Sequence, residues 1–243
     1  PQHFGHVELN IVSQSSPTGT QFLQATGAAF AMQRTDGNGV VYVSAGEGTT
    51  SQGDFHEALN WASRSKAPVI FHIENNRYAI SVPIVEQTAG ESVYKISAGY
   101  ENLARFNVDG TDFFETKLAF KKAIERARNG NGPSIIESEV VRLLPHSSSD
   151  DQRKYRSEDE LELDRQRDPI VIFKEKCISE FIADEKEFEK INDDIIIQVD
   201  NDAEWAELQS NPISDDHLKN IYSNYSVEID NSYKCTFGEK IVM

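Results

Sequence analysis

The fold is decided by a stretch that opens with Gly46-Glu47-Gly48-Thr49-Thr50-Ser51-Gln52-Gly53-Asp54 and closes with Pro68-Val69-Ile70-Phe71-His72-Ile73-Glu74-Asn75-Asn76-Arg77-Tyr78. An apolar, β-branched run at 40–43 precedes it and is typical of a buried strand. Between the two quoted segments, apolar residues recur at helical spacing and predict one buried helix face: Phe55, Ala58, Leu59 and Ala62. Residues 69–73 predict a second buried strand. The pattern therefore predicts two parallel strands joined by a right-handed helical crossover.

Two polar positions at the ends of these strands are the first candidates for a site. Parallel strands end at one edge of their sheet, so we expect Glu47 and Asn76 side by side where open α/β sheets bind ligands. Carboxylate, amide and carbonyl oxygens suit Mg²⁺. The glycine turn at 46–48 allows a close backbone approach and leads towards a helix N-terminus, which favours a diphosphate. A plain βαβ unit has the same pattern, so these residues alone leave both interpretations open.

Further strands and helices of the same class follow along the chain. A helical pattern at 94–106 precedes a strand and turn at 106–110, and residues 134–141 predict another strand. Thr111 or Asp112 is expected to cap a helix that runs to Arg128, and Thr18 or Thr20 to cap an earlier one striped by Phe22 and Ala25. The alternation predicts a doubly wound parallel α/β sheet with flanking helices. Three other segments are weaker: 6–12 as a strand or loop, 170–188 as amphipathic helix, and 195–199 as a buried helical turn or a strand.

Length and composition bound the class of protein. The chain has 243 residues and can bury a sizeable core. Its net charge of −16 argues against nucleic acid as a partner, and no apolar run is long enough to span a membrane. Cys177 and Cys235 make no disulfide framework and fit a reducing compartment. No signal peptide is visible, and Pro1 is not expected to be a native N-terminus.

The acidic residues are unevenly placed and suggest two parts. Residues 184–243 hold fifteen Asp and Glu against five Lys, so this segment carries ten of the sixteen net negative charges. We expect an N-terminally truncated α/β domain at 1–183 and an acidic helical tail and linker at 184–243. The linker is expected to start at 211–214.

Three separate blocks carry a resemblance to a known family. Gly46-Glu47-Gly48 with Asn75-Asn76 resembles the thiamine diphosphate motif, usually written GDG…NN. Glu in second place, within 46–54, resembles the α subunits of branched-chain 2-oxoacid dehydrogenases. The block from Ser15 to Gln21 and the block His146-Ser147-Ser148-Ser149-Asp150, followed by Tyr155-Arg156, are similar to that family in the same order. The resemblance runs from about residue 12 to about 170 and implies the α/β thiamine diphosphate-binding fold. Residues 237–243 weakly resemble the opening of the β subunit, as in fused α–β chains.

The resemblance also implies a set of cofactor and metal residues. Glu47, Asn76 and the backbone carbonyl of Tyr78 would hold Mg²⁺. The thiamine diphosphate contacts would be Ser16, Thr18, Gly46, Glu47, Gly48, Thr49, Asn76, Ala79, Ile80 and His146. A monovalent cation such as K⁺ would bind at Ser15, Pro17 (through its carbonyl), Thr20 and Gln21, although an ordinary capping turn has the same composition. Glu74 stands where family members carry Arg, so no diphosphate contact is expected of it.

His146 is the candidate catalytic residue. It lies in a serine-rich loop after a strand whose end points to the same edge as Glu47 and Asn76. A histidine in such a loop is commonly just exposed, but the resemblance implies an acid/base role near the reactive carbon of the cofactor. It also marks Ser147 as a possible regulatory phosphorylation site. We expect the loop to be mobile without cofactor, because its serines and aspartates offer no apolar anchor.

Together these features indicate the α part of a decarboxylating 2-oxoacid dehydrogenase component, with branched-chain 2-oxoacids as the favoured substrates. The alternatives are a pyruvate or acetoin dehydrogenase α subunit and a non-catalytic regulatory or assembly protein on the same fold. The implied partners are a β subunit or fused β domain and a lipoyl-bearing acyltransferase, in a homo-oligomer or α2β2 assembly. The implied location is the cytoplasm in a bacterium or the mitochondrial matrix in a eukaryote.

Overall fold

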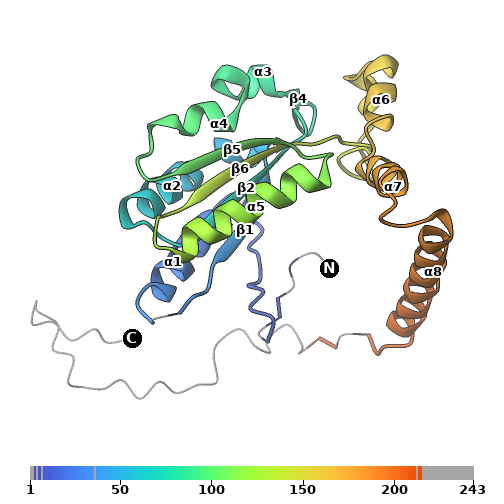
Figure 1. Cartoon of the computed structure of the whole chain (residues 1–243), viewed down its shortest axis with the longest axis horizontal. Helices are drawn as coiled ribbons and strands as arrows, with labels where there is room; N and C mark the ends of the chain where they lie inside the picture. Colours follow the sequence, from blue (N-terminus) through green and yellow to red (C-terminus); the bar gives the residue numbers. More distant parts are fainter. Residues whose placement is uncertain (1–2, 4, 7, 36, 212, 215–243) are drawn as a thin grey trace, which may run out of the picture. The chain divides into compact units, whose positions relative to one another are not determined.

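The computed structural model describes residues 3, 5–6, 8–35, 37–211 and 213–214 (Figure 1). The chain divides into two units, residues 1–185 and 186–243, and each is described by itself. Cys235 and the segment 237–243, with its resemblance to a β subunit, lie outside the described residues. No helix among the described residues is long and apolar enough to cross a membrane.

A four-stranded parallel sheet forms the centre of the first unit. Its strands are β1 (Val41–Gly46), β2 (Val69–Asn75), β5 (Ala104–Asp109) and β6 (Ser134–Glu139), in the spatial order β1-β2-β6-β5. The register places Gly46 beside Glu74 and Asn75 beside Glu139. The carboxyl ends of β1, β2 and β6 therefore lie next to one another, so the segments that follow these strands meet at one edge. A short antiparallel pair, β3 (Tyr78–Ala79) and β4 (Val82–Pro83), follows β2 directly.

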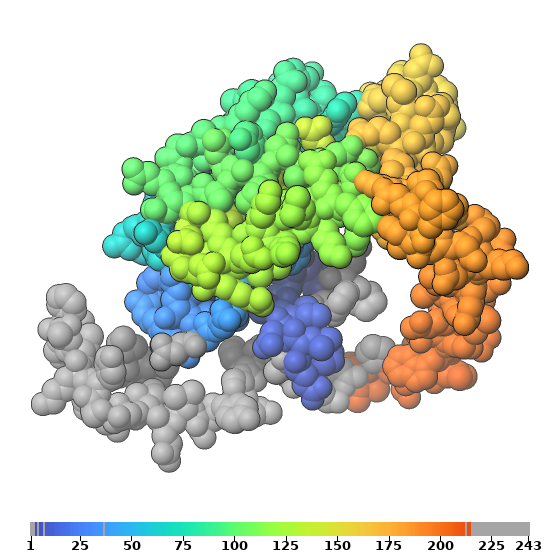
Figure 2. Space-filling model, in the orientation of Figure 1, coloured from blue at the N-terminus to red at the C-terminus, as the bar shows by residue number. Residues whose placement is uncertain are grey.

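Helices cover both faces of this sheet, as a doubly wound fold requires. One face carries α1 (Thr20–Met32), α2 (Gly53–Ser65) and α4 (Val93–Ile96), whose apolar side chains share a core with Phe71 and Ile73 of β2. In that core the ring of Phe22 lies 5.0 Å from the ring of Phe55. The other face carries α5 (Phe113–Arg128), which buries Ala119 and Ala123. Figure 2 shows the side chains of α5, in lime green, spread over this face of the sheet.

The remaining elements are mostly short. Short helical elements lie in the segments between and after the sheet strands: η1 (Glu47–Ser51), α3 (Ile84–Gln87), η2 (Ala89–Glu91), η3 (Ser97–Gly99) and η4 (Gln152–Lys154). After β6 come α6 (Glu158–Arg165), α7 (Pro169–Ser179) and α8 (Glu185–Glu207). Ser157 caps α6, because its side chain accepts a hydrogen bond from the Glu160 amide.

The four predicted sheet strands are confirmed, but several local expectations are wrong. The segment 94–106 is not one helix: α4 ends at Ile96, η3 ends at Gly99, and β5 begins at Ala104. Neither Thr18 nor Thr20 caps α1; Gly19 does, with a left-handed φ of 94° that favours glycine. Asp112, rather than Thr111, caps α5 through the amides of Phe114 and Glu115. Residues 195–199 are neither a strand nor buried: they lie in the middle of α8, where no residue is buried.

Candidate functional site

The turn after β1 places a buried carboxylate at the sheet edge. Glu47 opens η1 and is fully buried, and its Oε2 accepts a 3.1 Å hydrogen bond from the backbone amide of Asn76. Its Oε1 is buried and meets no hydrogen-bond donor in the described part of the chain. Burial raises the pKa of Glu47, and the Asn76 amide and the charge of Arg142 oppose that rise. A buried carboxylate oxygen without a donor from the described residues is suited to bind a metal cation.

The two asparagines at the carboxyl end of β2 have different roles. Asn75 is buried, and its side-chain Nδ2 donates to Glu137 at 2.7 Å, so it holds the strand end rather than facing the site. Asn76 is half-buried, and its Oδ1 accepts from the amide of Tyr78 at 3.1 Å. Glu47 and Asn76 thus come together at one edge, as the sequence predicted.

Packing against Ala79 of β3 requires a glycine at position 48. A Cβ at this position would lie 2.7 Å from the Cβ of Ala79, which is closer than real Cβ contacts come, and a tight 3.2 Å from its Cα. At Gly46 the nearest atom to such a Cβ would be the Glu74 carbonyl oxygen, at 3.9 Å. The contacts within the chain therefore explain Gly48 but not Gly46. The expected helix N-terminus is also displaced, because η1 separates the turn from α2, which begins at Gly53.

The serine- and threonine-rich turn before α1 joins the same edge. Gly19 packs against Gln52, since a Cβ on Gly19 would lie 2.9 Å from the Gln52 Cβ. Three of the four oxygens predicted for a monovalent cation meet there: the hydroxyls of Ser15 and Thr20 are hydrogen-bonded to each other, and Thr20 Oγ1 donates to the Pro17 carbonyl at 3.1 Å.

The other residues predicted to bind a cation or the cofactor near this turn make different contacts or are exposed. The fourth predicted oxygen, Oε1 of Gln21, accepts from the Gly19 amide at 3.1 Å instead. Ser16 and Thr18 are exposed, and Ser16 Oγ lies 3.2 Å from Nε2 of His3. Thr49 is half-buried.

The loop that carries His146 is held by a chain of polar contacts. The His146 amide donates to Asp150 Oδ2 at 2.9 Å, and the Tyr155 hydroxyl donates to the same oxygen at 2.6 Å. These two donors hold the pKa of Asp150 below its usual range. The imidazole of His146 and the hydroxyl of Ser147 are exposed; Ser147 Oγ lies 3.2 Å from Ser149 Oγ. The sequence did not predict these polar contacts, which anchor the loop. The mobility of the loop without cofactor stays a prediction.

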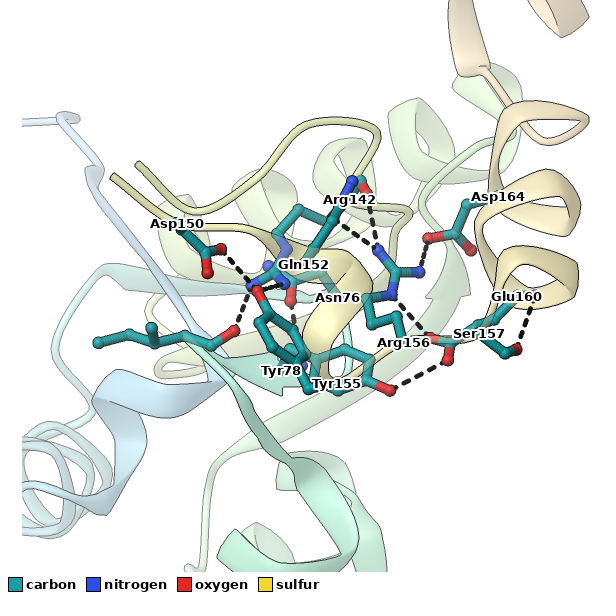
Figure 3. A network of polar contacts seen from close by, with 11 residues as sticks. Asn76, Tyr78, Arg142, Asp150, Gln152, Tyr155, Arg156, Ser157, Glu160 and Asp164 are labelled. Atoms are coloured by element: carbon teal, nitrogen blue, oxygen red, sulfur yellow. Dashed lines mark hydrogen bonds and ion pairs between the residues drawn. The ribbon is translucent and has the colours of Figure 1, made fainter. Parts of the chain in front are cut away.

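Arg142 connects that loop to the segment after β2 (Figure 3). It donates through one guanidinium nitrogen to the Ile80 carbonyl and through another to the Tyr155 hydroxyl, both at 2.7 Å. Ile80 has a left-handed φ of 58°, and its side chain is exposed. The Arg142 clamp therefore fixes both Ile80, a predicted cofactor contact, and the base of the His146 loop.

A second arginine, Arg156, is buried and contacts the backbone of Arg142. The Arg156 side chain is 1 % exposed, donates to the Arg142 carbonyl at 3.0 Å, and forms ion pairs with Glu160 and Asp164. Both guanidinium groups lie over the ring of Tyr78, with their central carbons 5.4 and 5.2 Å from its centroid, and the Tyr78 hydroxyl donates to Glu160 at 3.1 Å. The sequence block Tyr155-Arg156 was part of the resemblance, but no pattern in it indicated this role.

Glu137 is the other residue that the sequence did not predict. It is 1 % exposed in the middle of β6 and accepts four hydrogen bonds. They come from Asn75 Nδ2, the amides of Val93 and Tyr94, and the Ser92 hydroxyl. Ser92 precedes α4, so Glu137 ties the start of α4 to the end of β2. Its donors are far away in sequence, and no local signal identifies them.

The donor set fits Mg²⁺ bound together with a diphosphate. The described residues contain no cluster of three or more His, Cys, Asp or Glu that could hold a metal by itself. The edge supplies one carboxylate oxygen that has no donor among the described residues, an asparagine side chain and nearby carbonyls. Mg²⁺ commonly takes one or two carboxylates and completes its shell with phosphate oxygens and water. The residues present thus suit a metal that arrives with its phosphates.

A family model described as the dehydrogenase E1 component matches residues 2–214. The chain belongs to the dehydrogenase E1 component family. This family depends on thiamine diphosphate, which agrees with the donor set at the sheet edge.

Curated relatives of this E1 chain have consistent names. The chain is 44 % identical over 173 residues to the 2-oxoisovalerate dehydrogenase subunit alpha of Bacillus subtilis, covering 71 % of this chain and 52 % of that protein. It is 43 % identical over 156 residues to the 3-methyl-2-oxobutanoate dehydrogenase subunit alpha of Mycobacterium tuberculosis, covering 64 % and 42 %. It is 40 % identical over 188 residues to the mitochondrial 2-oxoisovalerate dehydrogenase subunit alpha of Homo sapiens, covering 77 % and 42 %. The chain thus spans about half the length of these relatives or less.

Proposed function

We propose that this chain is the metal- and diphosphate-binding part of a branched-chain 2-oxoacid dehydrogenase α subunit, or of a fused α–β chain. The observation that carries the proposal is the buried Oε1 of Glu47 beside Asn76, which meets no donor among the described residues, at the edge where the His146 loop is anchored. The printed names of the relatives support branched-chain 2-oxoacids as substrates over pyruvate or acetoin.

Different residues would bind the metal and diphosphate and carry out proton transfer. Glu47 and Asn76 would hold Mg²⁺ with the carbonyl of Tyr78, and so fix the diphosphate. Bound thiamine diphosphate supplies the electron sink for decarboxylation. His146 would exchange protons with the reacting groups during acyl transfer to a lipoyl group, because its imidazole is exposed on a loop tied to Ile80 through Arg142. Ser15, Pro17 and Thr20 would bind K⁺.

The proposed partners are a β subunit or fused β domain and a lipoyl-bearing acyltransferase, in an α2β2 or homo-oligomeric assembly. The relatives include bacterial and mitochondrial proteins. The proposed location is accordingly the cytoplasm of a bacterium or the mitochondrial matrix of a eukaryote.

A panel of 2-oxoacids tested on the assembled enzyme decides the proposal. We expect decarboxylation of branched-chain 2-oxoacids that needs thiamine diphosphate and Mg²⁺. Asn76→Ala should weaken Mg²⁺-dependent cofactor binding at least tenfold, and His146→Ala should spare cofactor binding while lowering acyl transfer. A preference for pyruvate or acetoin would instead indicate a pyruvate or acetoin dehydrogenase α subunit. An assembly that decarboxylates no 2-oxoacid would favour a regulatory or assembly protein.

A further inference from the structure

We propose that α8 is a docking helix whose exposed apolar stripe binds a basic protein surface, one that carries lysine or arginine beside an apolar groove. The proposal rests on the helix alone and does not depend on the proposed function.

The stripe runs along one side of α8. Ile191, Ile195 and Val199 follow one another at intervals of four residues, so they lie within an arc of about 80° at about 100° per residue. Their side chains are 58, 52 and 59 % exposed. Ala206 continues the stripe, which is then about 22 Å long at about 1.5 Å per residue. An amphipathic helix with anchors at this spacing is the usual ligand of a hydrophobic groove.

The charges around the stripe define the partner. The helix holds nine acidic residues and only two lysines. Asp202 lies on the stripe and Asp194 borders it, about 20° and 100° from Ile195. The two lysines, Lys186 and Lys190, lie about 180° and 140° from Ile195, on the opposite side. A partner that covers the stripe therefore meets carboxylates at its borders and no ammonium group.

A second copy of the helix is a poor occupant for that reason. Two α8 stripes packed together would place Asp194 and Asp202 of one copy near the same acidic residues of the other, and like charges beside a helical seam oppose pairing. A surface with Lys or Arg beside its groove converts the same borders into attraction and selects against acidic competitors.

Three synthetic helical peptides test this directly. They share one apolar stripe of leucines and differ only in the flanking residues, which are all lysine, all glutamine or all glutamate. Each is titrated into the full 243-residue chain and followed by fluorescence anisotropy, with sedimentation of the chain alone alongside. We expect the lysine peptide to bind at least tenfold more tightly than the glutamine peptide, with an affinity that falls as salt rises, and the glutamate peptide to bind least.

Two matched variants separate docking on the stripe from general attraction to an acidic chain. Ile195→Asp places a charge in the stripe, whereas Ile197→Asp places the same charge about 200° further round the helix, at a residue that is 59 % exposed. We expect Ile195→Asp to weaken the lysine peptide at least tenfold and Ile197→Asp to leave its affinity unchanged, with equal helix content by circular dichroism.

Several results would overturn the proposal. These are equal affinity for the three peptides, no measurable binding of any of them, or equal weakening by the two variants. A dimer of the free chain that Ile195→Asp dissociates would assign the stripe to a second copy instead.

Discussion

The carboxylate of Glu47 accepts a 3.1 Å hydrogen bond from the Asn76 amide through Oε2, while Oε1 lies buried without a donor from the described residues. A charge buried this way destabilises the fold until a cation reaches it. We expect Glu47→Gln in the assembled enzyme to be at least as stable as the parent without metal. Adding Mg²⁺ and thiamine diphosphate should raise the melting temperature of the parent but not of the variant.

The control is Glu74→Gln, which alters a carboxylate that is 51 % exposed at the end of the neighbouring strand. It should keep the ligand-dependent rise in melting temperature. A rise of the parent's size in Glu47→Gln would remove Glu47 from the metal site.

The two glycines of the turn predict opposite outcomes. A Cβ at Gly48 collides with Ala79, so Gly48→Ala should lower the stability of the chain without any ligand. Gly46 has room for a Cβ and an ordinary extended backbone, so Gly46→Ala should fold normally. If Gly46 is kept for the close approach of a cofactor, its alanine variant should lose thiamine diphosphate affinity in calorimetry. Normal affinity would show that the approach is not close there.

The buried Glu137 should contribute more to the free energy of unfolding than an exposed carboxylate does. Glu137→Gln would turn an amide group towards donors that now meet carboxylate oxygens, so we expect a loss of about 2–3 kcal/mol in the free energy of unfolding. Glu139→Gln, two residues on, alters a half-buried side chain that accepts one bond from Asn107 and should cost much less. Equal urea midpoints for the two variants would contradict the structural role of Glu137.

Glu137 also shows where sequence reasoning stops. The strands β1, β2 and β6 were predictable because each contains a short apolar, β-branched run, and turn residues next to such a run favour a strand over a helix. The meeting of Glu47 and Asn76 followed from parallel topology alone. The partners of Glu137 and Arg142 were not predictable, because they lie on segments brought together only by the complete fold. The helix at 94–106 failed because Ser97, Ala98 and Gly99 end the helical turns in favour of an early β5.

The Tyr155 hydroxyl bridges Arg142 and Asp150, so it should set the order of the His146 loop. In Tyr155→Phe the ring stays and the bridge is lost. We expect hydrogen exchange at the His146 and Asp150 amides to speed up about tenfold, since the opening of the loop becomes easier. Ser148→Ala changes an exposed side chain of the same loop and should leave both amides protected. Unchanged exchange in Tyr155→Phe would place the anchor of the loop elsewhere.

The last prediction concerns His72, a partly buried histidine on the α5 face of the sheet. His72 contacts the Tyr42 hydroxyl through Nδ1 and the Ser138 hydroxyl through Nε2, both at 2.9 Å, and stacks edge-on against Phe120. Burial lowers the pKa of His72, and the charge of Glu74 opposes this in part. The folded chain therefore binds this proton less readily than the unfolded chain does.

The stabilisation from neutral His72 is accordingly complete above the unfolded pKa of about 6.5. It is lost as the pH falls through that value towards the lower folded pKa. We expect the free energy of unfolding in urea to fall between pH 7.5 and 5.5, and part of this fall to vanish in His72→Phe. The variant should also be less stable at pH 7.5 by about 1–3 kcal/mol, because the buried Ser138 hydroxyl loses its partner. An identical pH slope in His72→Phe and the parent would show that His72 does not couple protonation to folding.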